Sequence, residues 1–230
     1  MTTNLAGRKL GIIHAALITT RAVQKFIDEV VPDVEVVHWV DDTIQNTNFA
    51  CEPGTIPRGN YAKFVQAALS QQEYGVDLIL LACSTFNRAA EFARPMIDTP
   101  ILQIDRPMMD LAVQDGCRIG LLATVPTTVP ASERLLRLAA EEAGKTIEVK
   151  LRLCSRAFAA IRAGRPDEHN DILIEEVSNL SREVDAIVMA QVSISALEPR
   201  LHETKVPVYN SGRTAFLRIR EILEAKAARS

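Results

Sequence analysis

Residues 76–83 read VDLILLAC and residues 184–191 read VDAIVMAQ, so one pattern recurs in the chain at an offset of 108. Each run opens with Val-Asp and continues with apolar residues, which is typical of a strand buried on both faces of a parallel sheet. Because α/β chains often contain strands of this kind, a single match can arise by chance. The question is whether the flanking sequence repeats as well.

Two further matches keep the same order along the chain. Upstream, residues 9–11 (KLG) match residues 118–120 (RIG) at an offset of 109. Downstream, residues 99–101 (TPI) match residues 206–208 (VPV) at an offset of 107. Three strand starts in register favour a real duplication. It predicts two similar lobes whose equivalent strand ends meet at a cleft, and ligands of open α/β sheets bind outside the carboxyl ends of strands.

Short β-branched runs alternate with longer helical patterns, which indicates parallel strands joined by helical crossovers. Strands are expected at residues 10–14, 34–40, 78–82, 101–104, 119–123, 148–153, 186–190 and 206–209. Helices are expected near residues 20–31, 58–73, 85–94, 106–114, 131–143, 155–163, 168–182 and 212–227. The predicted fold is α/β with two pseudo-symmetric lobes and the active site in the cleft between them. Residues 1–98 with 208–230 form the expected first lobe, and residues 99–207 the second.

Composition restricts the classes of partner and compartment. Apolar residues make up 47% of the 230 residues, enough for a sizeable core, and the net charge is only −3. This charge favours neither nucleic acid nor an anionic membrane surface, and no apolar run approaches the roughly 20 residues that span a bilayer. The first residues lack a signal-peptide pattern, and four scattered cysteines argue against disulfides or structural zinc. We expect a cytoplasmic protein, and association into a homo-oligomer is compatible with its size.

Cys83 follows the first of the two apolar runs, and Ser84, Thr85 and Asn87 open the next segment. A thiol at a helix N-terminus lies at the positive end of the helix dipole, where backbone N–H groups can stabilise a thiolate. The neighbouring hydroxyl and amide groups can bind a substrate carboxylate. A structural buried cysteine is the common alternative. The polar residues around Cys83 favour a catalytic thiol, with Ser84, Thr85 and Asn87 as substrate-binding residues.

The equivalent strand ends of the second lobe carry other polar residues. Gln191 occupies the position of Cys83, and a glutamine forms hydrogen bonds but cannot exchange a proton near neutral pH. The hydroxyl-rich segment 123–130 (ATVPTTVP) precedes a helix and suits oxyanion binding. Helix capping explains the same residue types equally simply. The residues expected to bind substrate in this lobe are Thr124, Thr127, Thr128, Gln191, Val192 and Ser193.

Other polar residues also follow predicted strands. His14 ends the first strand and is predicted as a second catalytic residue, acting as an acid or a base, although an internally bonded histidine is the commoner case. Asp41 and Asp42 are expected to form a turn rather than a metal site. Asp105 can orient a catalytic group or cap the next helix, and the cap is the preferred interpretation. No glycine-rich nucleotide-binding motif follows a strand. The loop at residues 48–54 can form part of a lid.

Three segments connect the chain to a known enzyme group. They are residues 82–85 (ACST) after an apolar strand, 100–105 (PILQID) beyond it, and 119–124 (IGLLAT) at the start of the second half. With the two-lobed repeat, these segments resemble the aspartate/glutamate/hydantoin racemase superfamily, which includes cofactor-independent amino-acid racemases, hydantoin and allantoin racemases, maleate isomerase and arylmalonate decarboxylase. The resemblance covers nearly the whole chain. It implies a small carboxylate or imide-like substrate and neither an organic cofactor nor a metal.

The resemblance also implies a mechanism, from which this chain departs at one position. In two-base members, a cysteine from each lobe faces the substrate α-carbon, so that one removes a proton and the other returns one. The resemblance makes Cys83 the first-lobe thiol, but Gln191 stands at the second. An isomerase or racemase that transfers a proton at a carbon next to a carboxylate or carbonyl group is therefore expected, with His14 available as the missing base. The alternatives are one-sided protonation in a decarboxylase of malonate-type acids, and a non-catalytic small-acid-binding protein.

Overall fold

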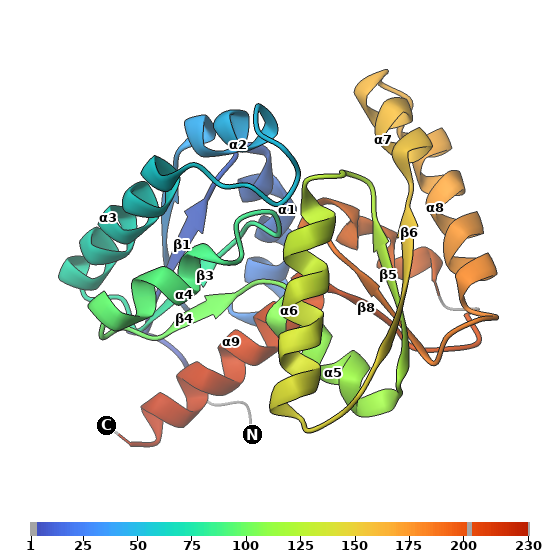
Figure 1. Cartoon of the computed structure of the whole chain (residues 1–230). Helices are drawn as coiled ribbons and strands as arrows, with labels where there is room; N and C mark the ends of the chain where they lie inside the picture. Colours follow the sequence, from blue (N-terminus) through green and yellow to red (C-terminus); the bar gives the residue numbers. More distant parts are fainter. Residues whose placement is uncertain (1–3, 202–203, 230) are drawn as a thin grey trace.

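The computed structural model describes residues 4–201 and 204–229. Two parallel four-stranded sheets lie side by side in two lobes (Figure 1). The first sheet has the order β2 (Glu35–Val40), β1 (Lys9–His14), β3 (Leu78–Leu81) and β4 (Ile101–Gln103). The second has the order β6 (Glu148–Leu153), β5 (Arg118–Ala123), β7 (Ala186–Met189) and β8 (Val208–Asn210). The two orders are equivalent, so the predicted α/β fold with two pseudo-symmetric lobes is confirmed.

Helices cover the sheets (Figure 1). In the first half of the chain they are α1 (Ile18–Val30), α2 (Asp42–Phe49), α3 (Arg58–Tyr74), α4 (Ala89–Ala93) and the 3-10 helix η1 (Arg94–Met96). They continue with α5 (Arg106–Asp115), α6 (Thr128–Glu142), α7 (Ser155–Arg162), α8 (Pro166–Leu180), the 3-10 helix η2 (Val192–Arg200) and α9 (Ser211–Ala227). None of the helices in the described ranges combines the length and apolar character that crossing a membrane requires.

The repeated Val-Asp pair has the same structural role in both lobes. In the first, Asp77 Oδ2 accepts a hydrogen bond of 2.9 Å from the backbone N–H of Lys9. In the second, Asp185 Oδ2 accepts a bond of 2.9 Å from the backbone N–H of Arg118. Each aspartate thus ties the start of one central strand to its neighbour, which explains why an acidic residue recurs before each buried strand.

The central strands are buried on both faces, which explains their near-continuous apolar sequence. In β3, Leu78 and Leu80 point into a core cluster with α1 and α9, whereas Ile79 and Leu81 point into a cluster with α3 and α4. Side chains of a strand alternate between faces, and the alternation continues past the strand end. Cys83 therefore lies in the α3–α4 cluster.

The strand pairing differs from the expected lobe boundaries. Ile101 of β4 pairs with β3 in the first sheet, although residues 99–207 were expected in the second lobe. Val208 of β8 pairs with β7 in the second sheet, although residues 208–230 were expected in the first. Each fourth strand thus pairs with the third strand of its own repeat. The chain changes lobe only after this strand.

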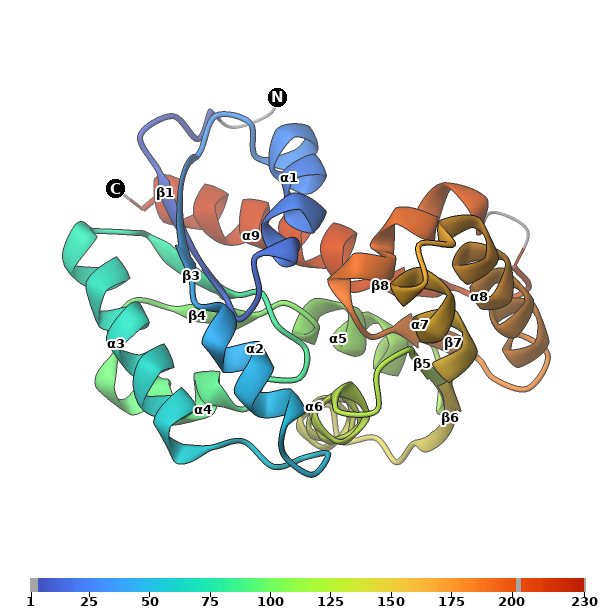
Figure 2. The same ribbon diagram turned by 90° about the horizontal axis from the view of Figure 1, so that it is seen from above.

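The helix after each fourth strand packs on the other lobe. Helix α5 follows β4, but its Met108 and Met109 join the core cluster of the second sheet. Helix α9 follows β8, but its Phe216 joins the core cluster of the first sheet, where it stacks on Phe26 of α1 with ring centroids 6.0 Å apart. Figure 2 shows α9 running alongside α1. The two lobes therefore exchange helices, and α5 and α9 also contact each other.

Helix α2 was not predicted. Asp41, expected in a turn, is its N-cap, and the carboxylate accepts a hydrogen bond from the backbone N–H of Thr43. Short polar residues favour both turns and helix starts, and the sequence after Asp41 lacks a strong apolar period. The helix predicted at residues 85–94 is shorter than expected, since α4 begins only at Ala89.

Candidate active site

Cys83 lies just beyond the carboxyl end of β3 and is 9% exposed. Its thiol is 3.7 Å from Gln45 Oε1 of α2, at the distance of a hydrogen bond donated by sulfur. Helix α2 places this amide beside the thiol, and Phe86 packs in the same core cluster. Gln45 is a residue that the sequence analysis missed, because the helix that carries it was not predicted.

Burial raises the pKa of the Cys83 thiol to about 12. The backbone N–H groups of Phe86 and Thr85 oppose this rise in pKa, whereas the negative charge of Asp105 adds to it. The predicted backbone donors are thus present, but desolvation outweighs them. The thiol of Cys83 is therefore protonated at neutral pH in this structure.

Thr85 connects the cysteine segment to the second lobe. Its hydroxyl lies 3.1 Å from that of Thr128 at the start of α6, and both residues are buried. The two threonines, predicted independently as substrate-binding residues of opposite lobes, therefore meet. This contact locates the cleft expected between the lobes.

A cavity of about 120 Å³ opens beside this contact and is lined from both lobes. Thr85 and Arg88 line it from the first lobe, and Thr127 and Arg134 from the second. The Thr127 Oγ1 atom is buried without a hydrogen-bond partner in the described residues. Arg134 forms two bonds of 2.6 Å to the carboxylate of Glu91, across the lobe boundary. The cavity thus combines threonine hydroxyls and two arginines, of which Arg134 is paired with Glu91, with apolar residues such as Ile56.

The loop between α2 and α3 borders this cavity through Gly54, Thr55 and Ile56, and the role of residues 48–54 as part of a lid stays a prediction. Gly54 has a φ of +87°, a conformation that side chains rarely adopt, and a Cβ atom there would lie 3.1 Å from Pro130 Cβ of α6. Thr55 and Ile56 also line the cavity. Figure 2 shows the loop reaching towards α6. Glycine at residue 54 thus permits both the turn and the close approach to the second lobe.

Gln191 occupies the second-lobe position equivalent to Cys83. Its Oε1 accepts two hydrogen bonds of 2.8 Å, from the backbone N–H and from the hydroxyl of Thr124. With its oxygen held in this way, the amide NH₂ is the free end of the side chain and can only donate. Gln191 has a φ of 150°, and among the described residues it is the one non-glycine residue with positive φ. Backbone strain of this kind clusters at functional sites.

His14 lies at the end of β1, fully buried, with both ring nitrogens engaged. Its Nδ1 is 2.6 Å from Thr19 Oγ1, and its Nε2 is 2.9 Å from His38 Nδ1. Because the Thr19 hydroxyl donates to the carbonyl of Ala16, it must accept from His14 Nδ1–H. Burial lowers the pKa of His14 to about 3, with a further contribution from His38. The contacts of His14 lead away from Cys83, and its catalytic role stays a prediction.

The lowered pKa of His14 predicts a pH-dependent stability. The unfolded chain takes up a proton near pH 6.5, whereas folded His14 resists it down to about pH 3. This contribution to stability is thus complete above pH 6.5 and is lost as the pH falls. Between pH 7.5 and 5.0, the free energy of unfolding should fall by about 2 kcal/mol less in His14→Asn than in the wild type.

Urea unfolding of both proteins at the two pH values checks this prediction. The variant must be compared with the wild type because Asp105 contributes stability in the opposite direction. Burial raises the pKa of Asp105 to about 6, so this group stabilises the fold as the pH falls. That opposite contribution is common to both proteins and cancels. Equal pH dependence in the two proteins would contradict the role assigned to His14.

The remaining predicted residues make internal contacts or lie outside the cavity. Asn87 donates through Nδ2 to Asp105 Oδ2 at 2.9 Å. Val192 packs into the core cluster of the first sheet. Ser84 is buried, and its side chain lowers the pKa of Asp105. Ser193 is exposed on η2. Of the predicted residues, Thr85 and Thr127 line the interlobe cavity, whereas these four residues do not.

Asp105 does not cap α5, so the expectation from sequence was wrong. It precedes the helix, but its side chain forms no capping bond and turns inward to Asn87 instead. Its carboxyl group is completely buried. The other interpretation of the sequence, that Asp105 orients a catalytic group, stays a prediction. An aspartate before a proline-initiated helix is so typical of a cap that its sequence context conceals an inward side chain.

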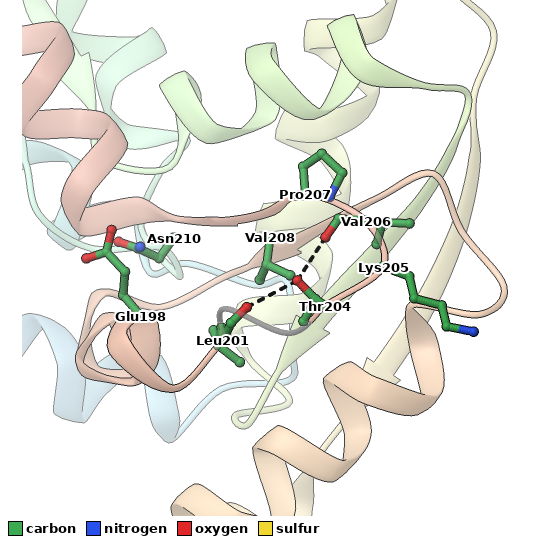
Figure 3. A pocket seen from close by; sticks show the side chains of 8 residues that line it. All are labelled: Glu198, Leu201, Thr204, Lys205, Val206, Pro207, Val208 and Asn210. Atoms are coloured by element: carbon green, nitrogen blue, oxygen red, sulfur yellow. Dashed lines mark hydrogen bonds between the residues drawn. The ribbon is translucent and has the colours of Figure 1, made fainter.

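A separate cavity of about 500 Å³ lies on the second lobe (Figure 3). Glu198, Lys205 and Asn210 contribute polar groups to it, and the Thr204 hydroxyl is bonded to the carbonyl groups of Leu201 and Val206. Residues 202–203 lie outside the described part. None of the predicted site residues lines this cavity. Within residues 4–201 and 204–229, no three His, Cys, Asp or Glu side chains gather closely enough to hold a metal ion.

Comparison with known proteins identifies the family. A sequence model described as Asp/Glu/hydantoin racemase matches residues 12–218, most of the chain. The chain belongs to the Asp/Glu/hydantoin racemase family. Within this family, a glutamate racemase from Trichodesmium erythraeum (strain IMS101) is 30% identical over 131 residues, which are 55% of this chain and 47% of that protein. The match thus spans about half the length of that curated relative.

Solved structures share the fold of this racemase-family chain at low identity. An aspartate racemase homologue from Pyrococcus horikoshii OT3 has a TM-score of 0.74 at 16% identity, covering 94% of this chain and 99% of that one. An allantoin racemase from Klebsiella pneumoniae has a TM-score of 0.68 at 18% identity, covering 96% and 89%. A glutamate racemase isoform from Bacillus anthracis has a TM-score of 0.69 at 16% identity, covering 96% and 83%. These similarities show a common two-lobed architecture.

Proposed function

We propose that this racemase-family chain transfers a proton, without a cofactor, at a carbon next to a carboxylate or carbonyl group, with Cys83 as the exchanging group. The position of the thiol carries the proposal. It lies just beyond the end of β3 beside the backbone N–H groups of Thr85 and Phe86, and Thr85 lines a cavity shared by both lobes. A protonatable group next to oxyanion donors is the arrangement that such chemistry needs.

The cavity supports a small acid or an imide-like compound as substrate. In the described residues Arg88 forms no ion pair, although it lies near the ring of Phe92, and Thr127 has a buried hydroxyl without a partner. A carboxylate or imide oxygen would supply the missing acceptor for both. The volume of about 120 Å³ limits the occupant to a small group.

Gln191 is suited to stabilising the intermediate of this reaction. Removal of an α-proton, or of carbon dioxide, leaves an enediolate whose negative charge resides on oxygen. The free NH₂ of Gln191 can donate to such an oxygen, because Thr124 holds the opposite end of the amide. One oxyanion donor of this type contributes about 3 kcal/mol to lowering a barrier. Thr85 and Thr128 are further hydroxyl donors, which contact each other at 3.1 Å.

A specific observation favours decarboxylation as a second candidate. The second-lobe thiol position holds Gln191, which cannot remove or return a proton, so the reaction has one thiol on one face. A malonate-type acid that loses carbon dioxide needs only one protonation of the resulting enediolate. The protonated thiol of Cys83 can deliver that proton and recover another from water. Racemisation would need a second base on the opposite face.

Deuterium exchange tests the proposal. A panel of small carboxylates and cyclic imides is first screened for binding by thermal shift, because a bound ligand raises stability by mass action. The compounds that bind are then incubated with the protein in heavy water. We expect deuterium at the α-carbon, followed by nuclear magnetic resonance, and a change in optical rotation if the product is racemised.

The outcomes separate the candidate functions. Exchange without release of carbon dioxide supports the isomerase or racemase. Release of carbon dioxide from a malonate-type acid, with one deuterium in the product, supports the decarboxylase. Binding without either reaction would leave a non-catalytic acid-binding protein and contradict the proposal.

A further inference from the structure

Asp105 is a buried acidic residue at the point where the chain leaves the first sheet. It follows β4, directly precedes α5, and is 0% exposed. Burial raises the pKa of its carboxyl group to about 6, while the side chains of Ser84, Asn87 and Ser211 oppose this rise. A buried carboxylate is unfavourable unless its surroundings compensate the charge. The packing of the core does not explain why a carboxyl group is buried at this position.

The contacts of Asp105 lead to the segment that carries Cys83. Its Oδ2 accepts a bond of 2.9 Å from Asn87 Nδ2, and Gln103 Nε2 of β4 donates to the Asn87 carbonyl at 2.8 Å. The side chain of Ser84, the residue after the cysteine, also interacts with the carboxyl group. Residues on both sides of Thr85 are thus held by one buried group and its neighbouring strand.

We infer that Asp105 is a positioning residue for Cys83, which anchors the segment 83–87 and places a negative charge beside the thiol. The charge disfavours a second anion nearby and adds to the effect of burial, which is the main cause of the raised pKa of Cys83. In the proposed function, on which this role rests, Cys83 would enter the reaction as a proton donor. Once loss of a proton or of carbon dioxide has left an enediolate, the S–H bond breaks, the proton goes to the enediolate carbon, and the resulting thiolate takes a proton from water.

The charged side chains on the helices that begin next to Asp105 form ion pairs elsewhere. The pairs are Arg106 with Asp110 and Glu142 on the α5 side, and Arg213 with Glu29 and Glu198 on the α9 side. Among the described residues, no cation contributes to the pKa shift of Asp105. Cys83 is thus the titratable group on which the carboxylate acts, and that action begins when Asp105 ionises near pH 6.

The pH profile of thiol reactivity tests this inference without any substrate. Wild type and Asp105→Asn are treated with methyl methanethiosulfonate from pH 5 to 9, and modification of Cys83 is followed by peptide mass spectrometry. At pH 5, where Asp105 is protonated, the two proteins should react at equal rates. At pH 8.5, Cys83 should react roughly tenfold faster in Asp105→Asn, which corresponds to one unit of pKa. The wild-type profile should bend near pH 6, and the variant profile should not.

Cys154 is the internal control, because it is a buried thiol of the second lobe with its pKa also raised to about 12. If Asp105 only supported the local structure, Cys83 would be modified faster in Asp105→Asn than in the wild type at pH 5 as well as at pH 8.5. That result, or identical profiles, would overturn the inference.

Asn87→Ala serves as a second variant if Asp105→Asn does not fold. It removes the hydrogen bond of 2.9 Å to Asp105 Oδ2, which lowers the pKa of Asp105, so the bend should move to higher pH. An unmoved bend would also overturn the inference. Because the readout is the thiol itself, a negative deuterium-exchange result would refute the proposed function and leave this profile standing.

Discussion

Cys83→Ala is expected to lower the rate of α-proton exchange by about 1000-fold, because general acid–base groups contribute roughly 10²–10⁴-fold to such reactions. Alanine removes the proton-carrying atom but keeps a small apolar side chain in a position that is 9% exposed. Gln45, which accepts from the thiol in the wild type, cannot replace it as an acid. The measurement is deuterium incorporation into the substrate at fixed protein concentration.

Cys154→Ala is the matched control for this variant. Cys154 is buried, lies at the start of α7 in the second lobe, and has its pKa raised to about 12 by burial. Its loss should leave exchange unchanged within about twofold, since it is remote from the interlobe cavity. Thermal unfolding of both variants shows whether each is folded. Retained exchange in folded Cys83→Ala would contradict the proposed role of this thiol.

Phe216→Ala should destabilise the protein by about 4 kcal/mol, the cost typical of removing a fully buried phenylalanine. Phe216 lies on α9, is 0% exposed, and stacks on Phe26 of α1. Alanine would leave a cavity between a helix contributed from the end of the chain and the sheet of the first lobe. Urea unfolding at pH 7.5 measures the loss.

Leu217→Ala provides the control on the same helix. Leu217 is the next residue of α9 and is 46% exposed, so its truncation should cost less than about 1 kcal/mol. Similar losses in the two variants would contradict the packing of α9 on the first sheet. A large loss confined to Phe216→Ala would support the exchange of helices between the lobes.

Most of the fold could be predicted because its signals are local. The apolar runs at residues 76–83 and 184–191 form central strands, and their offset reflects an internal repeat that the two sheets reproduce. Helix α2 was missed because its apolar period is weak. The expected lobe boundaries differ from the observed ones because the sequence repeat identifies equivalent strands only. A helix that covers each sheet, α9 on the first and α5 on the second, comes from the other repeat.

The candidate site could be predicted only in part. Cys83, Thr85, Thr128 and Gln191 follow strand ends, and parallel strand ends gather at one edge of a sheet. The inward turn of Asp105 and the amide of Gln45 depend on contacts between distant segments. Neither has a local sequence signal that distinguishes it from a helix cap or an exposed polar residue.

The sequence by itself determined the two-lobed α/β architecture, because the period and order of apolar residues are properties of neighbouring positions. It also determined that the lobes carry one thiol and one glutamine at equivalent strand ends. Only the tertiary structure decided the protonation of Cys83 and His14, since desolvation and the charge of Asp105 act through space. It likewise decided which threonines meet across the lobes, because that contact joins segments 43 positions apart.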